Sequence, residues 1–394
     1  MKNKEKFKLA VRRLLFGMNS ALLSCIPKKK GLVLFTAWFG EKYIDNSRYV
    51  YEYFLEHSNY SPVWMTSNPT IYAQLQKEGK PVVKKDSLRG KWLTVRAQAA
   101  FSSVQYTDYN TWCLRHCLYV DLGHGHPIKD PGDVGRPSYM RSVYTMITNR
   151  VYYYTIVAST KTKQNYNVVD IPQDHIFVSD FARNDVLIDE SLQKGKNVII
   201  DDFKKGRKAI VYMPTQRSGG ELKMNMNEIL PLDAIQQYCE KKGVVFIIKK
   251  HFYHRNEHED LSKYPNIMDV TNVDDIDPQV LLCQADMLIS DYSACYIDYM
   301  LLRRPIVFFQ YDLESFNYTE RKLYYNFEEL DIAPIVYNKQ NLVECIDNLF
   351  MQGDKWLEKR MVFAHENYFD NIEQKDGRKK VKDIFDRLYK QYFN

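Results

Sequence analysis

The chain has 394 residues, of which 45% are hydrophobic and 26% are charged. This length allows two domains of ordinary size, and the composition is that of a globular protein rather than a disordered or fibrous one. The seven cysteines are odd in number and scattered, which argues against a disulfide framework and favours free thiols in a reducing compartment.

The net charge of +6 is concentrated at the N-terminus. Residues 1–30 hold nine Lys/Arg and one acid, a net +8, so the rest of the chain carries about −2. Apolar residues such as Phe7 and Leu14 are interleaved with these cations, but the run is too interrupted to span a bilayer, which needs about 20 apolar residues. We expect residues 1–27 to form an amphipathic helix on an anionic membrane surface.

Two alternatives apply to this N-terminal segment. It can be a solvated helix packed on the body of the protein, or an arm that binds nucleic acid. The second is disfavoured because an apolar face has no role there and no basic-aromatic module follows. Since no cleavable signal is visible, a peripheral location on the cytoplasmic face of the cell membrane is expected, without nucleic-acid partners.

From residue 31 onwards strand-like and helix-like segments alternate. Helical spacing of aromatic residues predicts a helix over about 47–57. Apolar runs predict strands at 31–36, 62–65, 99–104, 117–122 and 155–158. Within this series Cys113 and Cys117 flank His116, but no second ligand pair follows at zinc-site spacing, so we interpret these cysteines as packing or loop residues.

A second series of the same kind begins after Lys194-Gly195-Lys196. A helix is expected around 230–241, and strands at 208–213, 244–248, 267–268, 287–289 and 306–309. Alternating strands and helices predict parallel sheets covered on both faces. The expected fold class is therefore α/β with two doubly wound domains, at 31–195 and 196–394, preceded by the segment 1–30.

The segment 287–309 is the most informative part of the chain. It reads as strand, polar turn, amphipathic helix, Pro305 and strand. Ser290 and Asp291 are N-cap residue types for the helix that follows. A helix start at the carboxyl end of a buried strand presents free N–H groups that suit a phosphate, to which Ser293 can add a donor. The alternative is that these residues only cap a helix.

Three strand ends of the second series carry related chemistry. Thr215, Arg217 and Ser218 follow one strand, Lys249, Lys250 and His251 follow another, and Ser290, Asp291 and Ser293 follow a third. Ligands of doubly wound sheets bind at the carboxyl ends of strands. If the three strands are neighbours, their hydroxyls and cations suit a pyrophosphate.

In the first series His124 follows a strand and lies between Gly123 and Gly125. The two glycines allow a sharp turn and close approach of a ligand. A histidine in such a turn can act as a general base near neutral pH, although a loop histidine bonded to nearby backbone is an equal alternative. A metal site that uses His124 and His126 is disfavoured because no carboxylate cluster supports it.

Several of these motifs together resemble the CDP-glycerol glycerophosphotransferases that build teichoic acids. Residues 123–129 are similar to the family's His-Gly-Thr-Pro-Leu-Lys element, and residues 212–217 to its Ala-Pro-Thr-Trp-Arg element. Further similar elements are Lys249-Lys250-His251, Arg183-Asn184-Asp185, Ser290 to Ser293, Asp298, Pro305, residues 311–314 and Asp376-Gly377-Arg378. The similarity runs in the family's order from about residue 33 to 380.

The resemblance implies a GT-B fold, with two facing Rossmann-like domains. The first would bind the acceptor and the second a CDP-polyol, CDP-glycerol or CDP-ribitol. It also implies transfer of polyol phosphate to an undecaprenyl-linked glycan or polyol-phosphate acceptor in teichoic acid or capsule synthesis, with release of CMP. No further cofactor and no metal are implied.

The resemblance also implies roles for individual residues. His124 and His251 match the catalytic histidines. The donor-binding positions are Thr215, Arg217, Ser290, Asp291, Ser293 and Asp298, and the acceptor-side or supporting positions are Gly123, Gly125, His126 and Lys129.

This sequence departs from the family pattern at His126, Ala182 and Gln216, where Thr, Pro and Trp are usual. These departures leave glycerol and ribitol open as the polyol. A GT-B glycosyltransferase that uses a nucleotide-sugar is the alternative enzyme, and a membrane-docked scaffold for glycan assembly is the non-enzymatic alternative.

Overall fold

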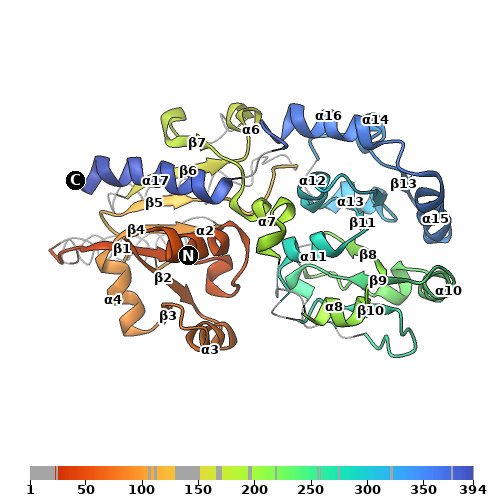
Figure 1. The fold of residues 1–394 in the computed structure, drawn as a ribbon, viewed down its shortest axis with the longest axis horizontal. Coiled ribbons are helices and arrows are strands. Elements are labelled where there is room, and N and C mark those ends of the chain that lie inside the picture. The colour runs from red at the N-terminus through yellow and green to blue at the C-terminus, as the bar shows by residue number, and fades with distance from the viewer. Residues whose placement is uncertain are drawn as a thin grey trace, which may run out of the picture. The chain divides into compact units, whose positions relative to one another are not determined.

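The computed structural model of the protein describes residues 23, 25–104, 108–110, 113–128, 151–165, 171–193, 198–217, 220–254, 257, 259–273, 276–319, 323–373 and 376–393. Most of the expected amphipathic segment, Ser218 and Lys129 lie outside these residues. The chain forms two compact α/β units, each built on a parallel sheet (Figure 1). In the described part of the chain, no helix combines the length and hydropathy needed to cross a bilayer.

The first unit comprises Met1–His124, Asp133–Arg183 and Asp376–Asn394. Its seven strands pair in the order β3-β2-β1-β4-β5-β6-β7, all parallel. They are β1 (Lys29–Phe35), β2 (Ser61–Thr66), β3 (Val82–Lys84), β4 (Ala97–Ser102), β5 (Leu118–Asp121), β6 (Tyr152–Val157) and β7 (Ile176–Val178). The central strands are buried along most of their length because helices cover parallel sheets on both faces.

The helices described in this unit are short, except for those at Asp45–His57 and Gly377–Phe393. The α-helices are α2 (Asp45–His57), α3 (Pro69–Lys77), α4 (Leu88–Arg96), α6 (Thr160–Asn165) and α17 (Gly377–Phe393), with 3-10 turns η1 (Trp38–Gly40), η5 (Gln173–His175) and η6 (Ala182–Asn184). Asn68 caps α3 and Ser87 caps α4 through side-chain hydrogen bonds. The helix α17 packs on α2, and the ring of Phe385 contacts Phe54 of α2 and Phe101 of β4.

The second unit comprises Gly125–Gly132 and Asn184–Lys375. Its six strands pair in parallel in the order β10-β9-β8-β11-β12-β13. They are β8 (Lys208–Met213), β9 (Val244–Ile248), β10 (Ile267–Asp269), β11 (Met287–Ser290), β12 (Ile306–Phe309) and β13 (Ile335–Val336). Because β8 lies between β9 and β11, the three strands expected to carry donor chemistry are neighbours, which is the condition stated above for a shared pyrophosphate site.

Short helices alternate with these strands (Figure 1). They are α7 (Asp185–Ile188), α8 (Val198–Lys204), α9 (Met226–Ile229), α10 (Leu232–Lys242), α11 (Pro278–Gln284), α12 (Cys295–Met300), α13 (Leu313–Thr319), α14 (Phe327–Leu330), α15 (Leu342–Gln352) and α16 (Leu357–Asn367), with η7 (Glu190–Leu192), η9 (Phe252–His254) and η10 (Lys339–Asn341). Apolar residues of α10 and α15 complete a core with the inner strands.

The division of the chain differs from the expected boundaries in three places, one of which is the segment that begins at Gly125, expected in the first domain but part of the second unit. Residues 184–195 belong to the second unit, where the Sγ atom of Cys283 contacts the carbonyl of Val186 and Gln279 donates to Asn184. The helix α17, expected in the second domain, belongs to the first unit because its aromatic face completes that unit's core. Neither contact is visible as a local sequence pattern.

Candidate active site

The turn after β5 is fixed by three hydrogen bonds to two side chains, those of Asp121 and Asn46. Gly123 has a φ of +64°, a left-handed conformation that favours glycine. Its N–H donates to Oδ1 of Asp121 at 3.0 Å. The buried side chain of Asn46 donates to the carbonyls of Leu122 and Gly123, both at 3.0 Å. The turn predicted from the glycine is therefore confirmed, and it is held rigidly.

The ring of His124 has a defined proton arrangement. Its Nδ1 lies 3.1 Å from the carbonyl oxygen of Ser103. A carbonyl can only accept, so Nδ1 carries the hydrogen and, in the neutral ring, Nε2 carries the lone pair. The side chain is exposed, and Trp38 meets its ring edge-on at 5.4 Å between centroids. The geometry suits a general base at Nε2.

An ion pair between Arg183 and Asp45 holds the backbone at His124. Nη1 of Arg183 donates to the carbonyl of His124 at 2.6 Å and to Oδ1 of Asp45 at 3.0 Å. The indole Nε1 of Trp38 donates to the other oxygen of Asp45 at 3.1 Å. Trp38, Phe39 and Asp45 have φ values of 48°, 60° and 69°. Such strain in non-glycine residues is characteristic of functional sites.

Two carboxyl groups near this turn have altered acidity. Burial raises the pKa of Asp121, although the N–H of Gly123 and the hydroxyl of Tyr153 lower it. Burial also raises the pKa of Asp108 to about 6, against the lowering effect of N–H donors from Phe39 and Val104. Shifted carboxyl groups of this kind cluster at active sites, although structural networks shift them as well.

In the second unit Arg217 joins three strand ends. Its Nη2 donates to Asp291 at 2.8 Å, its Nε donates to Asp312 at 2.7 Å, and its Nη1 donates to the carbonyl of Thr215 at 2.6 Å. Although burial alone lowers the pKa of Arg217, the two carboxylates raise it above its ordinary value. With these donors engaged, Arg217 orders the ends of β8, β11 and β12 relative to one another.

The interpretation of Ser290 and Asp291 as helix caps is wrong. The helix α12 begins at Cys295, and its N-cap residue Ala294 makes no side-chain cap. The hydroxyl of Ser290 donates instead to the carbonyl of Met213 at 3.0 Å. Asp291 is fully buried and accepts from the N–H and hydroxyl of Thr215, because Arg217 neutralises it there. Ser293 remains half-buried, with its hydroxyl 3.5 Å from the N–H of Cys295.

A buried ionic cluster lies beneath the loop that follows β9. The ammonium of Lys250 lies 3.1 Å from Glu259, 3.5 Å from Glu257 and 3.8 Å from Asp269. The two glutamates also accept from the N–H groups of Met224 and Met226, at 3.2 and 2.7 Å. The cluster therefore ties the chain segment after Arg217 to the segment after His251.

His251 itself has the reverse arrangement to His124. The N–H of Tyr253 donates to its Nδ1 at 3.4 Å, which places the hydrogen of the neutral ring on Nε2. The side chain is half-buried, and its ring contacts Tyr253 at 4.7 Å between centroids. A ring held in this way can donate a hydrogen bond from Nε2 to an anion.

His126 and Asp298 form a pair inside the second unit. Nε2 of His126 lies 3.2 Å from Oδ1 of Asp298, and both side chains are buried. The rings of Tyr368 and Phe369 pack edge-on against His126. This pairing differs from the expected placement of Asp298 on the donor side and His126 on the acceptor side, and it anchors Gly125 and its neighbours to α12.

Sequence reasoning missed Trp38, Asp45, Asn46 and Asp108, and it singled out Arg183 and Asp312 only as parts of family elements. The run Asp45-Asn46-Ser47 before a helical pattern was an available signal, since such residues commonly begin helices. Their contacts with Arg183 and Gly123 span more than seventy residues and have no local signature.

Sequence comparison identifies relatives over nearly the whole chain. Residues 18–386 match the family described as CDP-glycerol:poly(glycerophosphate) glycerophosphotransferase. The teichoic acid glycerol-phosphate transferase of Staphylococcus aureus is 26% identical over 366 residues, which cover 87% of this chain and 90% of the relative. The teichoic acid poly(glycerol phosphate) polymerase of Bacillus subtilis is 27% identical over 83% of this chain, but the match spans 45% of its own length. The S. aureus ribitol-phosphate polymerase TarK is 28% identical over 55% of this chain and 42% of its own.

Solved structures share the fold. The wall teichoic acid polymerase TagF superposes with a TM-score of 0.73 at 20% identity, covering all of this chain and 98% of the other. A TagF variant with CDPG gives a TM-score of 0.76 at 20% identity, with both chains fully covered. The UDP-GlcNAc 2-epimerase of Neisseria meningitidis gives 0.54 at 12% identity, covering 93% of this chain and all of the other.

Proposed function

Because the chain belongs to the CDP-glycerol:poly(glycerophosphate) glycerophosphotransferase family, we propose that it transfers polyol phosphate from a CDP-activated donor to an acceptor hydroxyl. The membership makes the chain a transferase. Glycerol phosphate is the first candidate for the transferred group, and the proposed acceptor is a lipid-linked glycan or a teichoic acid or capsule polymer. The observation that carries the proposal is the exposed His124, whose Nε2 is left unprotonated by the bond from Nδ1 to Ser103.

In the proposed reaction, Nε2 of His124 takes the proton of the acceptor hydroxyl as that oxygen attacks the β-phosphorus of the donor. The new P–O bond forms while the bond from the β-phosphorus to the oxygen bridging the two phosphates breaks. CMP leaves with that bridging oxygen. Phosphoryl transfer depends mainly on positioning and charge stabilisation, so a rigid base and an ordered phosphate site are the main requirements.

On the donor side, we assign phosphate contacts to Nε2 of His251 and to the half-buried hydroxyl of Ser293. Thr215, Arg217, Ser290 and Asp291 order these groups through the bonds described above. Carboxylates repel phosphate, so Asp291 and Asp312 belong to the support of Arg217 rather than to the ligand contacts.

A donor panel tests the proposal. With a lipid-linked acceptor, CDP-glycerol should give CMP. Comparison with the CMP released from CDP-ribitol identifies which polyol phosphate is transferred. A nucleotide-sugar that gives nucleoside diphosphate would identify a glycosyltransferase instead. A rise in melting temperature on adding CDP-glycerol would show nucleotide binding, which the alternative of a non-enzymatic scaffold does not predict.

The variant His124→Ala should abolish turnover and largely keep donor binding. The matched control is His175→Ala, because Nδ1 of His175 likewise donates to a backbone carbonyl, that of Tyr153 at 2.9 Å. Full activity in His124→Ala would reject His124 as the base.

We also propose that the enzyme acts at the cytoplasmic face of the membrane as a peripheral protein. The support is the net +8 of residues 1–30 and the alternation of cations with apolar residues there. The names of the relatives, which concern teichoic acid synthesis, are compatible with this location.

A further inference from the structure

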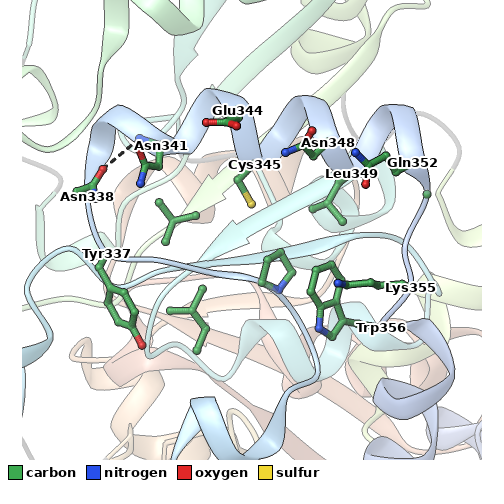
Figure 2. A pocket seen from close by; sticks show the side chains of 14 residues that line it. Tyr337, Asn338, Asn341, Glu344, Cys345, Asn348, Leu349, Gln352, Lys355 and Trp356 are labelled. Carbon is green, nitrogen blue, oxygen red and sulfur yellow. Dashed lines mark hydrogen bonds between the residues drawn. The ribbon is translucent and has the colours of Figure 1, made fainter.

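A groove of about 530 Å³ lies along the edge of the second sheet, between β13 and α15 (Figure 2). Pro334, Ile335 and, on α15, Leu349 are apolar residues of the lining, and Tyr337 and Trp356 stand at the side facing α15. This volume is within the usual range for small-molecule sites, which are mostly apolar with a few placed polar groups. The groove shares no lining residue with the Arg217 cluster.

The two aromatic side chains of the groove are held in place by their polar ends. The hydroxyl of Tyr337 donates to Glu328, and Nε1 of Trp356 donates to Asp331 at 2.9 Å. Both acceptors belong to α14 or to the residue that caps it. Tyr337 is 42% exposed as a residue, whereas the ammonium of Lys355 lies 4.5 Å from the centroid of the Trp356 ring. Tyr337 therefore offers an open, fixed aromatic face, and Trp356 forms the end wall.

The opposite wall is a row of carboxamides. Asn341, Asn348 and Gln352 line the groove from α15 or the turn before it. Among the described residues, no hydrogen bond engages their side-chain amides, and each can both donate and accept. The charged groups that line the groove, Glu344 and Lys355, offset one another. The groove therefore has no excess of cations for a phosphate and no excess of acids for a cationic ligand.

We propose that this groove binds a neutral sugar residue. A pyranose has an apolar face of C–H groups that stacks on an aromatic ring, and hydroxyls at its edge that bond carboxamides. The groove presents that combination, with Tyr337 on one side and Asn348 and Gln352 on the other. The proposal concerns binding alone, so neither its confirmation nor its rejection depends on the proposed phosphotransferase reaction.

Saturation-transfer difference NMR on the full chain tests the site, with methyl glucopyranoside as the probe and glycerol as an acyclic comparison. The glucoside should bind with its C–H face receiving most saturation. Tyr337→Ala should weaken binding about tenfold, and Asn348→Ala about three- to tenfold. The control is Met351→Ala, since Met351 lies on α15 but outside the groove and is 71% exposed. It should bind as the parent does.

Several results would overturn the proposal. One is no saturation transfer, and another is equal transfer in the parent and both groove variants. Displacement of the glucoside by CDP would place the sugar at a nucleotide site instead. Sedimentation equilibrium that shows a dimer in the parent and a monomer in Tyr337→Ala would identify the groove as an interface between copies of this chain.

Discussion

His124 and His251 are held in opposite proton arrangements by backbone groups. Nδ1 of His124 donates to the carbonyl of Ser103, whereas Nδ1 of His251 accepts from the N–H of Tyr253. Nε2 of the neutral ring is therefore a base in His124 and a hydrogen-bond donor in His251. The two histidines of the family resemblance are suited to different tasks.

Glutamine substitutions separate these tasks, because a carboxamide can donate a hydrogen bond but cannot take a proton at neutral pH. His124→Gln should lower kcat by about 10²–10⁴-fold, the usual contribution of a general base. His251→Gln should lose only about tenfold, as for one hydrogen bond. The measurement is CMP release at saturating donor, and equal losses in the two variants would mean that His251 also transfers a proton.

Arg217 is expected to be a major determinant of stability. Arg217→Met leaves Asp291 buried without a counter-charge, which should reduce the free energy of unfolding by about 3–5 kcal/mol. Lysine cannot reproduce the fork of donors, so Arg217→Lys should recover little. Urea unfolding measures the loss.

The control for Arg217 is Arg303→Met, because Arg303 pairs with Glu373 at an exposed site and should contribute little. If Arg217→Met were as stable as this control, the three strand ends would be ordered by other contacts.

The cluster around Lys250 should control the mobility of two loops. Lys250→Met leaves Glu257 and Glu259 without their shared cation. Hydrogen exchange at the amides of Met224 and Met226 should then accelerate, since those N–H groups bond the same glutamates. Adding Glu259→Gln should restore part of the protection.

The matched control here is Lys263→Met, whose partner Asp233 is exposed. Its exchange pattern should equal that of the parent. Unchanged exchange in Lys250→Met as well would show that the cluster does not hold the loops.

Asp108 should make stability depend on pH in the acid range. Its pKa of about 6 in the folded state lies above the value of about 3.9 for an unfolded chain. The folded state therefore binds this proton more tightly, and stability falls as the pH rises from about 4 to about 6 and is level above that. The change is about 3 kcal/mol.

Asp108→Asn cannot titrate, so the difference in unfolding free energy between the parent and this variant isolates the group. In urea unfolding across that pH range, the parent should lose stability as the pH rises, whereas the variant should not lose this contribution. The free energy of unfolding of the parent minus that of the variant should therefore decrease with pH. A constant difference would mean that the folded-state pKa of Asp108 is ordinary.

Deleting residues 1–27 should move the protein to the soluble fraction. Binding of the full chain to anionic vesicles should weaken with salt, because screening acts on the net positive charge of this region. Vesicle co-sedimentation with and without the segment measures this. Equal binding by the shortened chain would assign membrane attachment to another surface.

The sequence predicted long, apolar elements well and short or distant relationships poorly. The bounds of β8 and β9 match the expected runs because each is a continuous apolar stretch between polar turns. The edge strands β3 and β13 were missed, since three and two residues are too few to show a period. The start of β6 was obscured by three tyrosines that belong to the strand itself.

Within the site, Asp291 shows where local reasoning fails. Its position before a helix favoured a cap, but an ion pair with Arg217, 74 residues away in the sequence, determines its contacts. A hydrogen bond between a guanidinium and a carboxylate is stronger than one between neutral groups. The sequence placed Thr215, Arg217 and Asp291 at strand ends, and these strands are neighbours, whereas the contacts of each residue depend on that pairing.

The position of α17 in the first unit has a consequence for the order of folding. The hydroxyl of Tyr389 accepts from the N–H of Gly31, and Lys380 pairs with Asp180. A Cβ at Gly377 would lie 2.5 Å from the carbonyl of Asp180, so the helix can begin there only with glycine. During synthesis, the aromatic surface of the first unit that α17 covers therefore stays exposed until α17 leaves the ribosome. The second unit, whose pieces all precede α17, can close earlier.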